Sequence, residues 1–447
     1  MFLIGGLLVL QVPFALVCNT FFLSDDLQMV RFGATFPLGE IGWLPSSKWA
    51  WHRPLPALGW ILNYRATGFS PIGFHLPNVL IHAGNTALAY GLWRRLGWER
   101  SPSAWAAALF AWSPVTAGTV MWVSARPDLL AVFFMLAALI VSASHRVSML
   151  RLGAVALLAI LAVSSKESAF ALAPVVVALA FFGVGLGPAP PSLNRVQPAA
   201  AAIVVAVLGC FLSARWWLYG STLGGYGVPL RAARAVASPL RGILSSAFPV
   251  VFDRLGVAGL LFSATALVVT LWFAPGLALS SAVAALPAAH LVSSSLPFWE
   301  YDRFYYFVAV WTTGSIVALL GTCRRRGVLS STTVTVVLCL VLAANLGYLL
   351  TRAAGFRRAG ALAARVDATL RSHVGRLPAG TVILCDALPD HLEGAYVYRN
   401  GCSEHVALIW PDGSVTGGRM ASGGRPGGTA VFALSPDGLT LKRAGVH

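Results

Sequence analysis

Two adjacent carboxylates, Asp25 and Asp26, follow the first apolar run of the chain, residues 2–23. A carboxylate at the edge of an apolar layer is costly unless it is paired, hydrated or used. One of the two, partly desolvated, could act as a general base while the other orients it or a substrate hydroxyl. The structural alternative is that the pair, with Ser24, caps a helix that begins at Leu27. The position of the Asp25–Asp26 pair, directly after an apolar run, favours the catalytic interpretation.

Cations suited to binding a phosphate occur at three later points of the chain. Arg53 follows His52, and arginine can bind a phosphate through two parallel N–H groups. Lys166, followed by Glu167, is one of only three lysines among 32 basic residues, which favours a specific role over snorkelling to the membrane surface. Arg303 stands in an aromatic run, where it could face phosphate in a pocket wall or join a salt bridge in an aromatic belt.

A polar face occurs at the start of the second apolar run. His75, Asn78, His82 and Asn85 are three or four residues apart, so they share one face of a helix. A polar face within a membrane span points into the helix bundle. His82 could be a metal ligand, but we favour a buried, hydrogen-bonded histidine that holds helices together.

Two further clusters combine acidic and basic side chains. Arg126 and Asp128 stand on either side of a proline, where they could pair with each other or belong to a site, and both interpretations stay open. Glu300 and Asp302 precede Arg303, so the same choice applies there between a salt bridge and a pocket wall.

These side chains must be positioned by apolar elements. Hydrophobic residues make up 57% of the 447-residue chain and charged residues only 11%, against about 25% in soluble domains. The sequence therefore predicts an all-α polytopic membrane protein with about eleven transmembrane helices, including a retained first span. The expected spans are at about 2–23, 75–93, 103–123, 127–144, 152–165, 168–186, 199–218, 256–274, 276–296, 304–321 and 328–350.

The net charge of +16 would suggest nucleic acid in a soluble protein. Here the arginines lie mostly in short loops after even-numbered spans, which is the positive-inside pattern. The N-terminus is then cytoplasmic, and the candidate site and the C-terminal end face outward. The bias toward arginine and alanine is typical of a GC-rich bacterial genome, so we expect an integral protein of a bacterial plasma membrane.

The C-terminal part, residues 352–447, differs in composition and predicts a small extracytoplasmic α/β domain after a membrane domain of residues 1–351. We expect a helix at 357–375 and strands at 381–385, 396–398, 406–410 and 429–434. Cys385 and Cys402 could form a disulfide in an oxidising compartment or remain two thiols. The sequence has no CxxC motif, so a metal or redox centre is weakly indicated.

The motifs, taken in order over residues 20–310, resemble those of the C-type glycosyltransferases that use polyprenol-phosphate sugars. The closest likeness is to bacterial relatives of protein O-mannosyltransferases and of the transmembrane-and-TPR O-mannosyltransferases. The matching strings are Ser-Asp-Asp, His-Arg-Pro-Leu, Gly-Phe-Ser-Pro-Ile-Gly-Phe-His-Leu-Pro-Asn, Ala-Arg-Pro-Asp-Leu-Leu, Ser-Lys-Glu-Ser and Glu-Tyr-Asp-Arg-Phe-Tyr-Tyr.

The resemblance implies many spans, with two short helices in a catalytic external loop at 24–73. It also implies an inverting transfer of a sugar from a polyprenyl-phosphate monosaccharide to an acceptor hydroxyl, with Asp25 or Asp26 as base. The donor phosphate would bind at Lys166 and, less directly, at Arg53 and Arg303. No cofactor or metal is expected. The supporting residues would be His52, His75, His82, Asn85, Arg126, Asp128, Glu167, Glu300 and Asp302.

Three other functions remain possible from the sequence. A ligase for a lipid-linked glycan could use the arginines of loop 219–255. A transporter or flippase should show inverted repeats with matching broken spans, and the sequence has no such symmetry. A non-catalytic protein of envelope assembly could use its C-terminal domain for binding. No spacing in the sequence identifies the sugar or the acceptor.

Overall fold

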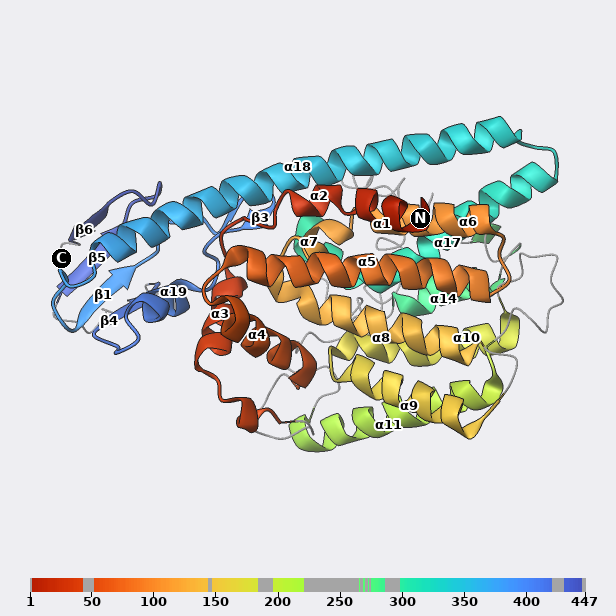
Figure 1. Ribbon diagram of the computed structural model, residues 1–447, viewed down its shortest axis with the longest axis horizontal. Coiled ribbons are helices and arrows are strands. Elements are labelled where there is room, and N and C mark those ends of the chain that lie inside the picture. The colour runs from red at the N-terminus through yellow and green to blue at the C-terminus, as the bar shows by residue number, and fades with distance from the viewer. Residues whose placement is uncertain are drawn as a thin grey trace.

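The computed structural model describes residues 2–42, 52–143, 147–183, 196–220, 275–285, 298–419 and 430–443, with four further positions between 265 and 272. Most of these residues are helical. A bundle of helices lies beside one long helix, α18, which reaches past the bundle to a small sheet at one end of the molecule (Figure 1).

The first expected span is not one helix. α1 (Phe2–Leu10) is followed by α2 (Val12–Ala15) and then by turns that lead to residue 23. The prediction of a continuous helix over 2–23 is therefore wrong. Pro13 lies at the start of α2, where its missing N–H and fixed φ suit a new helix better than the interior of an old one.

The two helices predicted for the loop at 24–73 are confirmed. α3 (Asp25–Thr35) leads through the short turn η1 (Leu38–Glu40) towards α4 (Pro54–Thr67). The helices α3 and α4 pack closely, because a side chain at Gly33 would come within 2.6 Å of the carbonyl oxygen of Trp60. This packing orients the first turn of α3, which carries both carboxylates.

The bundle that follows has a core of large side chains, in which the rings of Trp93 and Trp311 meet edge to face. Within the described residues, four helices are long and apolar enough to cross a membrane, over Val123–Ser142, Pro198–Leu218, Asp302–Arg325 and Ser331–Ser372. The elements are α5 (Pro71–Arg95), α6 (Arg100–Ala111), α7 (Thr116–Val120), η2 (Val123–Ala125), α8 (Arg126–Ser142), α9 (Met149–Val163), η3 (Glu167–Ala171), α10 (Leu172–Phe182), α11 (Pro198–Tyr219), α14 (Pro275–Ala284), α16 (Phe298–Tyr301), η5 (Asp302–Tyr305) and α17 (Tyr306–Arg325).

Several expected spans differ from these helices, so the count of eleven is not confirmed. The expected span 103–123 is broken, because α6 ends at Ala111 and Pro114 stands in the turn before α7. The expected span 256–274 lies almost wholly outside the described residues, and α14 covers only part of the span expected at 276–296.

The long helix α18 (Ser331–Ser372) joins the bundle to the C-terminal domain. Its 42 residues extend over about 63 Å. The separate span and helix expected at 328–350 and 357–375 are thus one element, and the boundary at 351 falls inside it. Its C-terminal half packs on the sheet side, where Leu362, Val366 and Leu370 are buried.

The predicted α/β domain contains a four-stranded sheet in the order β4-β1-β5-β6. The predicted strands at 381–385 and 429–434 are confirmed, whereas residues 406–410 fall in a helix, because a short apolar run does not distinguish the two. The third predicted strand, at 396–398, is shorter and begins one residue earlier. The elements are β1 (Thr381–Leu384), β2 (His391–Leu392), β3 (Ala395–Tyr396), α19 (Cys402–Ile409), β4 (Val415–Gly418), β5 (Ala430–Leu434) and β6 (Leu441–Arg443).

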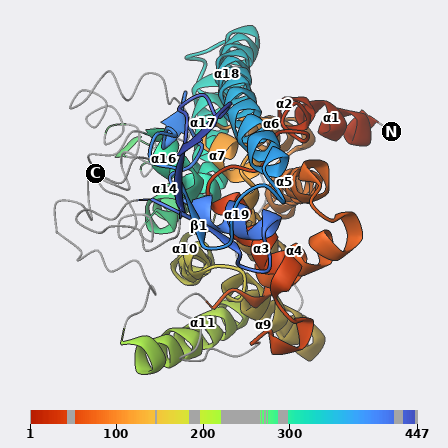
Figure 2. The same ribbon diagram turned by 90° about the vertical axis from the view of Figure 1, so that its left-hand side faces the viewer.

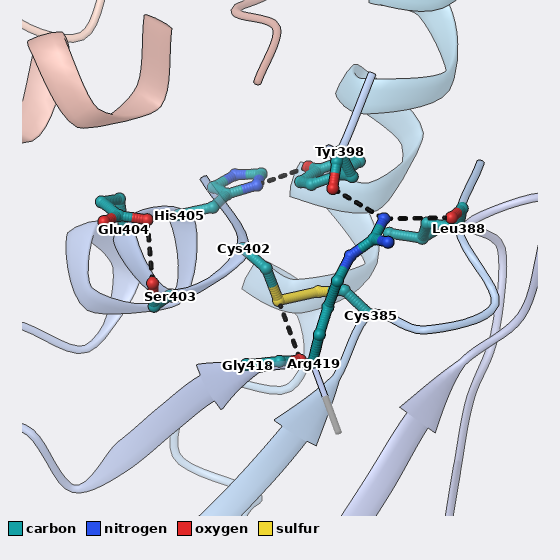
Figure 3. The surroundings of a disulfide bond; sticks show 9 residues. All are labelled: Cys385, Leu388, Tyr398, Cys402, Ser403, Glu404, His405, Gly418 and Arg419. Carbon is teal, nitrogen blue, oxygen red and sulfur yellow. Dashed lines mark hydrogen bonds between the residues drawn. A yellow bond between two sulfur atoms is a disulfide. The ribbon is translucent and has the colours of Figure 1, made fainter. Parts of the chain in front are cut away.

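A disulfide between Cys385 and Cys402 closes the loop that connects β1 to α19 (Figure 3). Of the two alternatives left open by the sequence, the structure thus has the bond. The loop also carries Tyr398, whose carbonyl accepts a 2.7 Å hydrogen bond from Arg419. The domain lies at the same end of the bundle as α3 and α4, so the carboxylates and the disulfide-closed loop share one end of the molecule (Figures 1 and 2).

Candidate functional site

Asp26 is buried at the start of α3, where it holds neighbouring elements together. Its carboxylate accepts hydrogen bonds from the backbone N–H and hydroxyl of Ser124, at 2.8 and 2.7 Å, and from the N–H of Leu23 at 3.2 Å. Burial raises the pKa of Asp26 to about 7, against the lowering effect of these hydrogen bonds. Asp26 therefore ties η2 to the first turn of α3.

Asp25 is half-buried and points to a different neighbour. Its Oδ1 accepts a 2.6 Å hydrogen bond from the side-chain amide of Asn400, in the C-terminal domain. Ser24 does not cap α3, because its hydroxyl accepts a hydrogen bond from the backbone N–H of Asn400 instead. Of the two carboxylates, Asp25 is the one with room to meet a substrate.

Arg303 is connected to the carboxylate pair through Trp122. Its guanidinium lies 4.6 Å from the ring centroid of Trp122 and 4.8 Å from that of Phe304. The indole N–H of Trp122 donates to the carbonyl of Leu23, the residue whose N–H binds Asp26. Within the described parts of the chain, no carboxylate lies within salt-bridge distance of Arg303. Its charge is therefore available to an anion.

Lys166 also lies close to the Phe304 ring and is already paired. Its Nζ is 5.0 Å from the centroid of the Phe304 ring and donates a 2.6 Å hydrogen bond to Asp128. Of the alternatives left open for Arg126 and Asp128, the structure does not have a pair between them, since Arg126 donates to the side-chain oxygen of Asn78 and to a backbone carbonyl. Lys166 and Arg303 thus both lie close to one aromatic ring, and among the described residues Lys166 has a carboxylate partner whereas Arg303 has none.

Arg53 and Glu167 form the second buried pair of the region. Nε of Arg53 donates to Glu167 at 3.1 Å, and its Nη2 donates to the other carboxylate oxygen. Burial alone would raise the pKa of the Glu167 carboxyl, but the charges of Arg53 and Lys166 outweigh it and hold that pKa below its ordinary value. His52, next to Arg53 in the chain, is also buried.

The polar face of α5 has the structural role favoured by its spacing. His82 contacts the hydroxyl of Tyr306 at 2.6 Å and the carbonyl of Ala111 at 3.1 Å, and Asn85 donates to the same hydroxyl. His75 is buried on the same helix. Across the ranges that the structure describes, no group of three or more His, Cys, Asp or Glu side chains is arranged to hold a metal ion.

A small cavity adjoins Arg303 where the bundle meets the C-terminal domain. It has room for a water-sized group, about 10 Å³, and its walls combine aromatic rings with cationic groups. Asp302 lies at its base and accepts a hydrogen bond from the backbone N–H of Gly118. The aromatic and cationic residues that line the cavity are Trp122, Trp299, Arg303, Arg352 and Tyr396.

Glu300 connects this cavity to the C-terminal domain. Its carboxylate accepts hydrogen bonds from the hydroxyl of Tyr396 at 3.1 Å and from Nη1 of Arg399 at 3.2 Å. Sequence reasoning missed both of these partners, as it missed Asn400. They stand about a hundred residues or more from the groups that they contact, and no local spacing marks them.

No protein-family model matches the chain. It is similar over short stretches to proteins named protein O-mannosyl-transferase: human TMTC4, 38% identical over 100 residues, and Drosophila melanogaster Tmtc1, 40% identical over 77 residues. These stretches cover 19% and 17% of this chain, and only 14% and 9% of the relatives. A Caenorhabditis elegans protein of the same description is 31% identical over 133 residues, or 29% of this chain and 19% of its own length.

Two solved structures match most of this chain at low identity. The oligosaccharyltransferase of Archaeoglobus fulgidus gives a TM-score of 0.49 at 14% identity, covering 92% of this chain and 62% of that one. ArnT from Cupriavidus metallidurans gives 0.46 at 12% identity, covering 93% and 89%. The sequence matches confirm the predicted resemblance to protein O-mannosyltransferases.

Proposed function

We propose that this protein is a membrane glycosyltransferase that moves a monosaccharide from a polyprenyl-phosphate donor to an acceptor hydroxyl. The observation that carries the proposal is the arrangement of Asp25 and Arg303. Asp25 is a half-buried carboxylate, and Arg303 is a guanidinium with no carboxylate partner among the described residues. The Trp122 ring lies against Arg303, and its indole N–H donates to the carbonyl of Leu23, two residues before Asp25. Sugar transfer from a phosphate needs both groups, one for the proton and one for the leaving group.

Asp25 is the proposed general base. It removes the proton of the acceptor hydroxyl while the acceptor oxygen attacks the anomeric carbon of the sugar. Asp26 is fully engaged with Ser124 and Leu23, so it holds the first turn of α3 in place. The assignment is supported by exposure, because Asp25 is half-buried and Asp26 is 1% exposed.

Arg303 is the proposed partner of the leaving group. As the bond between the anomeric carbon and the phosphate oxygen breaks, polyprenyl phosphate leaves with the electron pair. A guanidinium already in place stabilises this charge, and removing one such donor typically slows turnover 10²–10³-fold. Lys166, close to the same Phe304 ring, adds positive charge if a phosphate oxygen shares its ammonium group with Asp128.

The stereochemistry follows from the two ends of the site. With the base on one face of the sugar and the phosphate on the other, the acceptor attacks in line and the anomeric configuration inverts. The rings of Trp122, Trp299 and Tyr396 line the small cavity beside Arg303, which in this structure admits a water-sized group and would have to widen to admit a sugar. By the charge pattern of the loops, the reaction takes place on the external face of a bacterial plasma membrane.

The test is transfer by the purified protein in detergent. Because the relatives are named as mannosyl-transferases, the first donor to test is polyprenyl-phosphate mannose with a radiolabelled sugar. The acceptors are serine- and threonine-rich peptides and extracted envelope glycans. We expect labelled product from the wild type, and a loss of about 10²–10⁴-fold in Asp25→Asn. Equal product from wild type and Asp25→Asn would refute the assignment of the base.

No described contact favours the other functions. The loop at 219–255, on which the ligase interpretation rests, lies outside the described residues except for its first two positions.

A further inference from the structure

We propose that the loop closed by the Cys385–Cys402 disulfide is part of the catalytic site, in which Asn400 is the positioning residue for Asp25. The inference rests on the proposed function, because it needs Asp25 to act as a base. It assigns to the C-terminal domain a direct part in the reaction at the membrane domain.

Asn400 binds the start of α3 through two of its groups. Its side-chain amide donates to Oδ1 of Asp25 at 2.6 Å, and its backbone N–H donates to the hydroxyl of Ser24 at 3.2 Å. The backbone N–H of Ser24 in turn donates to the carbonyl of Val397 at 2.8 Å. Three hydrogen bonds therefore join the disulfide-closed loop to the two residues that begin the candidate site.

The backbone dihedral angles of Ser24 and Gly401 allow the loop and the start of α3 to approach each other closely. Ser24 has φ 49° and ψ −116°, a conformation that a residue with a side chain adopts only when its surroundings hold it there. Gly401 has φ +91°, and a side chain at this position would come within 2.3 Å of the carbonyl oxygen of Ser24. Strain directly before a candidate catalytic carboxylate, held by a loop of another domain, points to a functional contact.

A second set of contacts fastens the same loop near Arg303. The Tyr396 hydroxyl and Arg399 both donate to Glu300. The Tyr396 ring lies 5.4 Å from that of Trp122 and 5.2 Å from that of Trp299, measured between centroids. The loop thus reaches both ends of the proposed site, the base at Asp25 and the surroundings of the phosphate-binding arginine.

The loop is also stiffened from within (Figure 3). The disulfide is adjacent to Gly401 and only two positions from Asn400. Tyr398 donates from its hydroxyl to Nδ1 of His405 at 2.6 Å, and the other ring nitrogen of His405 donates to Asp367 of α18 at 2.9 Å. The position of the Asn400 amide is therefore fixed against α18 as well as against α3.

An amide suits this role chemically. It donates a hydrogen bond to one oxygen of the Asp25 carboxylate, leaves the other oxygen for the acceptor hydroxyl, and takes no part in proton transfer itself. A second carboxylate in its place would repel Asp25, whereas a small apolar residue would only release it. The two substitutions therefore separate an electrostatic contact from simple packing.

The experiment compares Asn400→Ala and Asn400→Asp with wild type, using polyprenyl-phosphate mannose and the acceptor that gives product. If Asn400 positions Asp25, kcat should fall about 10- to 100-fold in Asn400→Ala and further in Asn400→Asp, with the donor KM unchanged. Ser403→Ala is the matched control, because Ser403 is exposed three residues away and its side chain binds only Glu404 among the described residues. It should match the wild type.

A packing role predicts the opposite order, because aspartate has the shape of asparagine and should be the milder change. That order, or wild-type kcat in both variants, would overturn the role of Asn400 while leaving the proposed transferase intact. Wild-type turnover in Asp25→Asn would instead remove the base itself, and the proposed function would fail first. Thermal unfolding of each variant in detergent checks that the loss is one of turnover.

Discussion

Lys166 and Asp128 form an ion pair of 2.6 Å in which both side chains are almost completely buried. Breaking such a pair by removing one partner leaves an uncompensated charge and costs about 3–5 kcal/mol, whereas replacing both with apolar residues is often neutral. We therefore expect Lys166→Ala to unfold at a markedly lower temperature than the wild type, and Lys166→Met with Asp128→Leu to recover most of the loss.

The same pair of variants tests the donor role of Lys166. If the lysine also contacts the donor phosphate, the stable double variant should still bind polyprenyl-phosphate mannose more weakly than the wild type in a pull-down or fluorescence titration. Unchanged affinity in the double variant would make the pair structural only.

Arg303 is the cation that we expect to matter most for turnover. In Arg303→Ala, kcat should fall about 100-fold, because the charge facing the leaving phosphate is lost. Arg303→Lys should retain part of the activity, since lysine keeps the charge but not the two parallel N–H groups. Arg324→Ala, at the opposite end of α17, is the control and should leave kinetics unchanged; equal losses in all three would point to a general effect on folding.

The buried carboxyl of Asp26 predicts a pH dependence of stability. Its pKa is raised to about 7 from an ordinary 3.8, so between these values the folded state holds a proton that the unfolded state has lost. The contribution is fully present below about pH 3.8 and is lost as the pH rises through 7. From pH 5 to 8, the melting temperature of the wild type should fall relative to that of Asp26→Asn.

Asp26→Asn is the reference for the wild type in that measurement, because the two proteins share all other titrating groups. A difference in melting temperature that stays constant from pH 5 to 8 would show that Asp26 does not change its protonation over this range.

The sequence was sufficient to predict the helical membrane domain, the two helices α3 and α4 and the domain of mixed α/β structure. It also identified the polar face of α5, because residues three and four apart must share one side of a helix. Hydrophobic content and helical spacing are local properties, which a single sequence carries directly.

The partners of the site residues could not be predicted in this way. The hydrogen bond between Asn400 and Asp25 joins residues 375 positions apart, and nothing near either residue specifies the other. The sequence suggested Arg126 as one possible partner of Asp128 because the two are close in the chain, but helix packing brings Lys166 to it instead. The extended α18 was divided in two because its apolar and polar halves differ in composition while sharing one backbone helix.

The predicted independence from metal ions can be tested directly. The proposed transfer uses a carboxylate for the proton and cationic side chains for the phosphate, so it needs no bound ion. Treatment with EDTA, followed by gel filtration, should leave the rate of sugar transfer unchanged, and added Mn²⁺ or Mg²⁺ should not raise it. Loss of activity on chelation, restored by one of these ions, would contradict the prediction.

The disulfide should control the order of the loop next to the site. By loop-closure entropy, a cross-link between residues 17 apart stabilises the folded loop by about 3 kcal/mol. In Cys385→Ser with Cys402→Ser, we expect faster hydrogen exchange over residues 385–402 and lower kcat, with little change in the helices of the bundle. Cys210→Ser with Cys339→Ser is the control, since both of these thiols are free and exposed.

Reduction of the disulfide with dithiothreitol should reproduce the loss of kcat in the wild type and in the control, and should have no further effect on the variant without the disulfide. If reduction left both exchange and turnover unchanged, the contacts of Asn400 and Tyr396 would be sufficient to hold the loop without the bond.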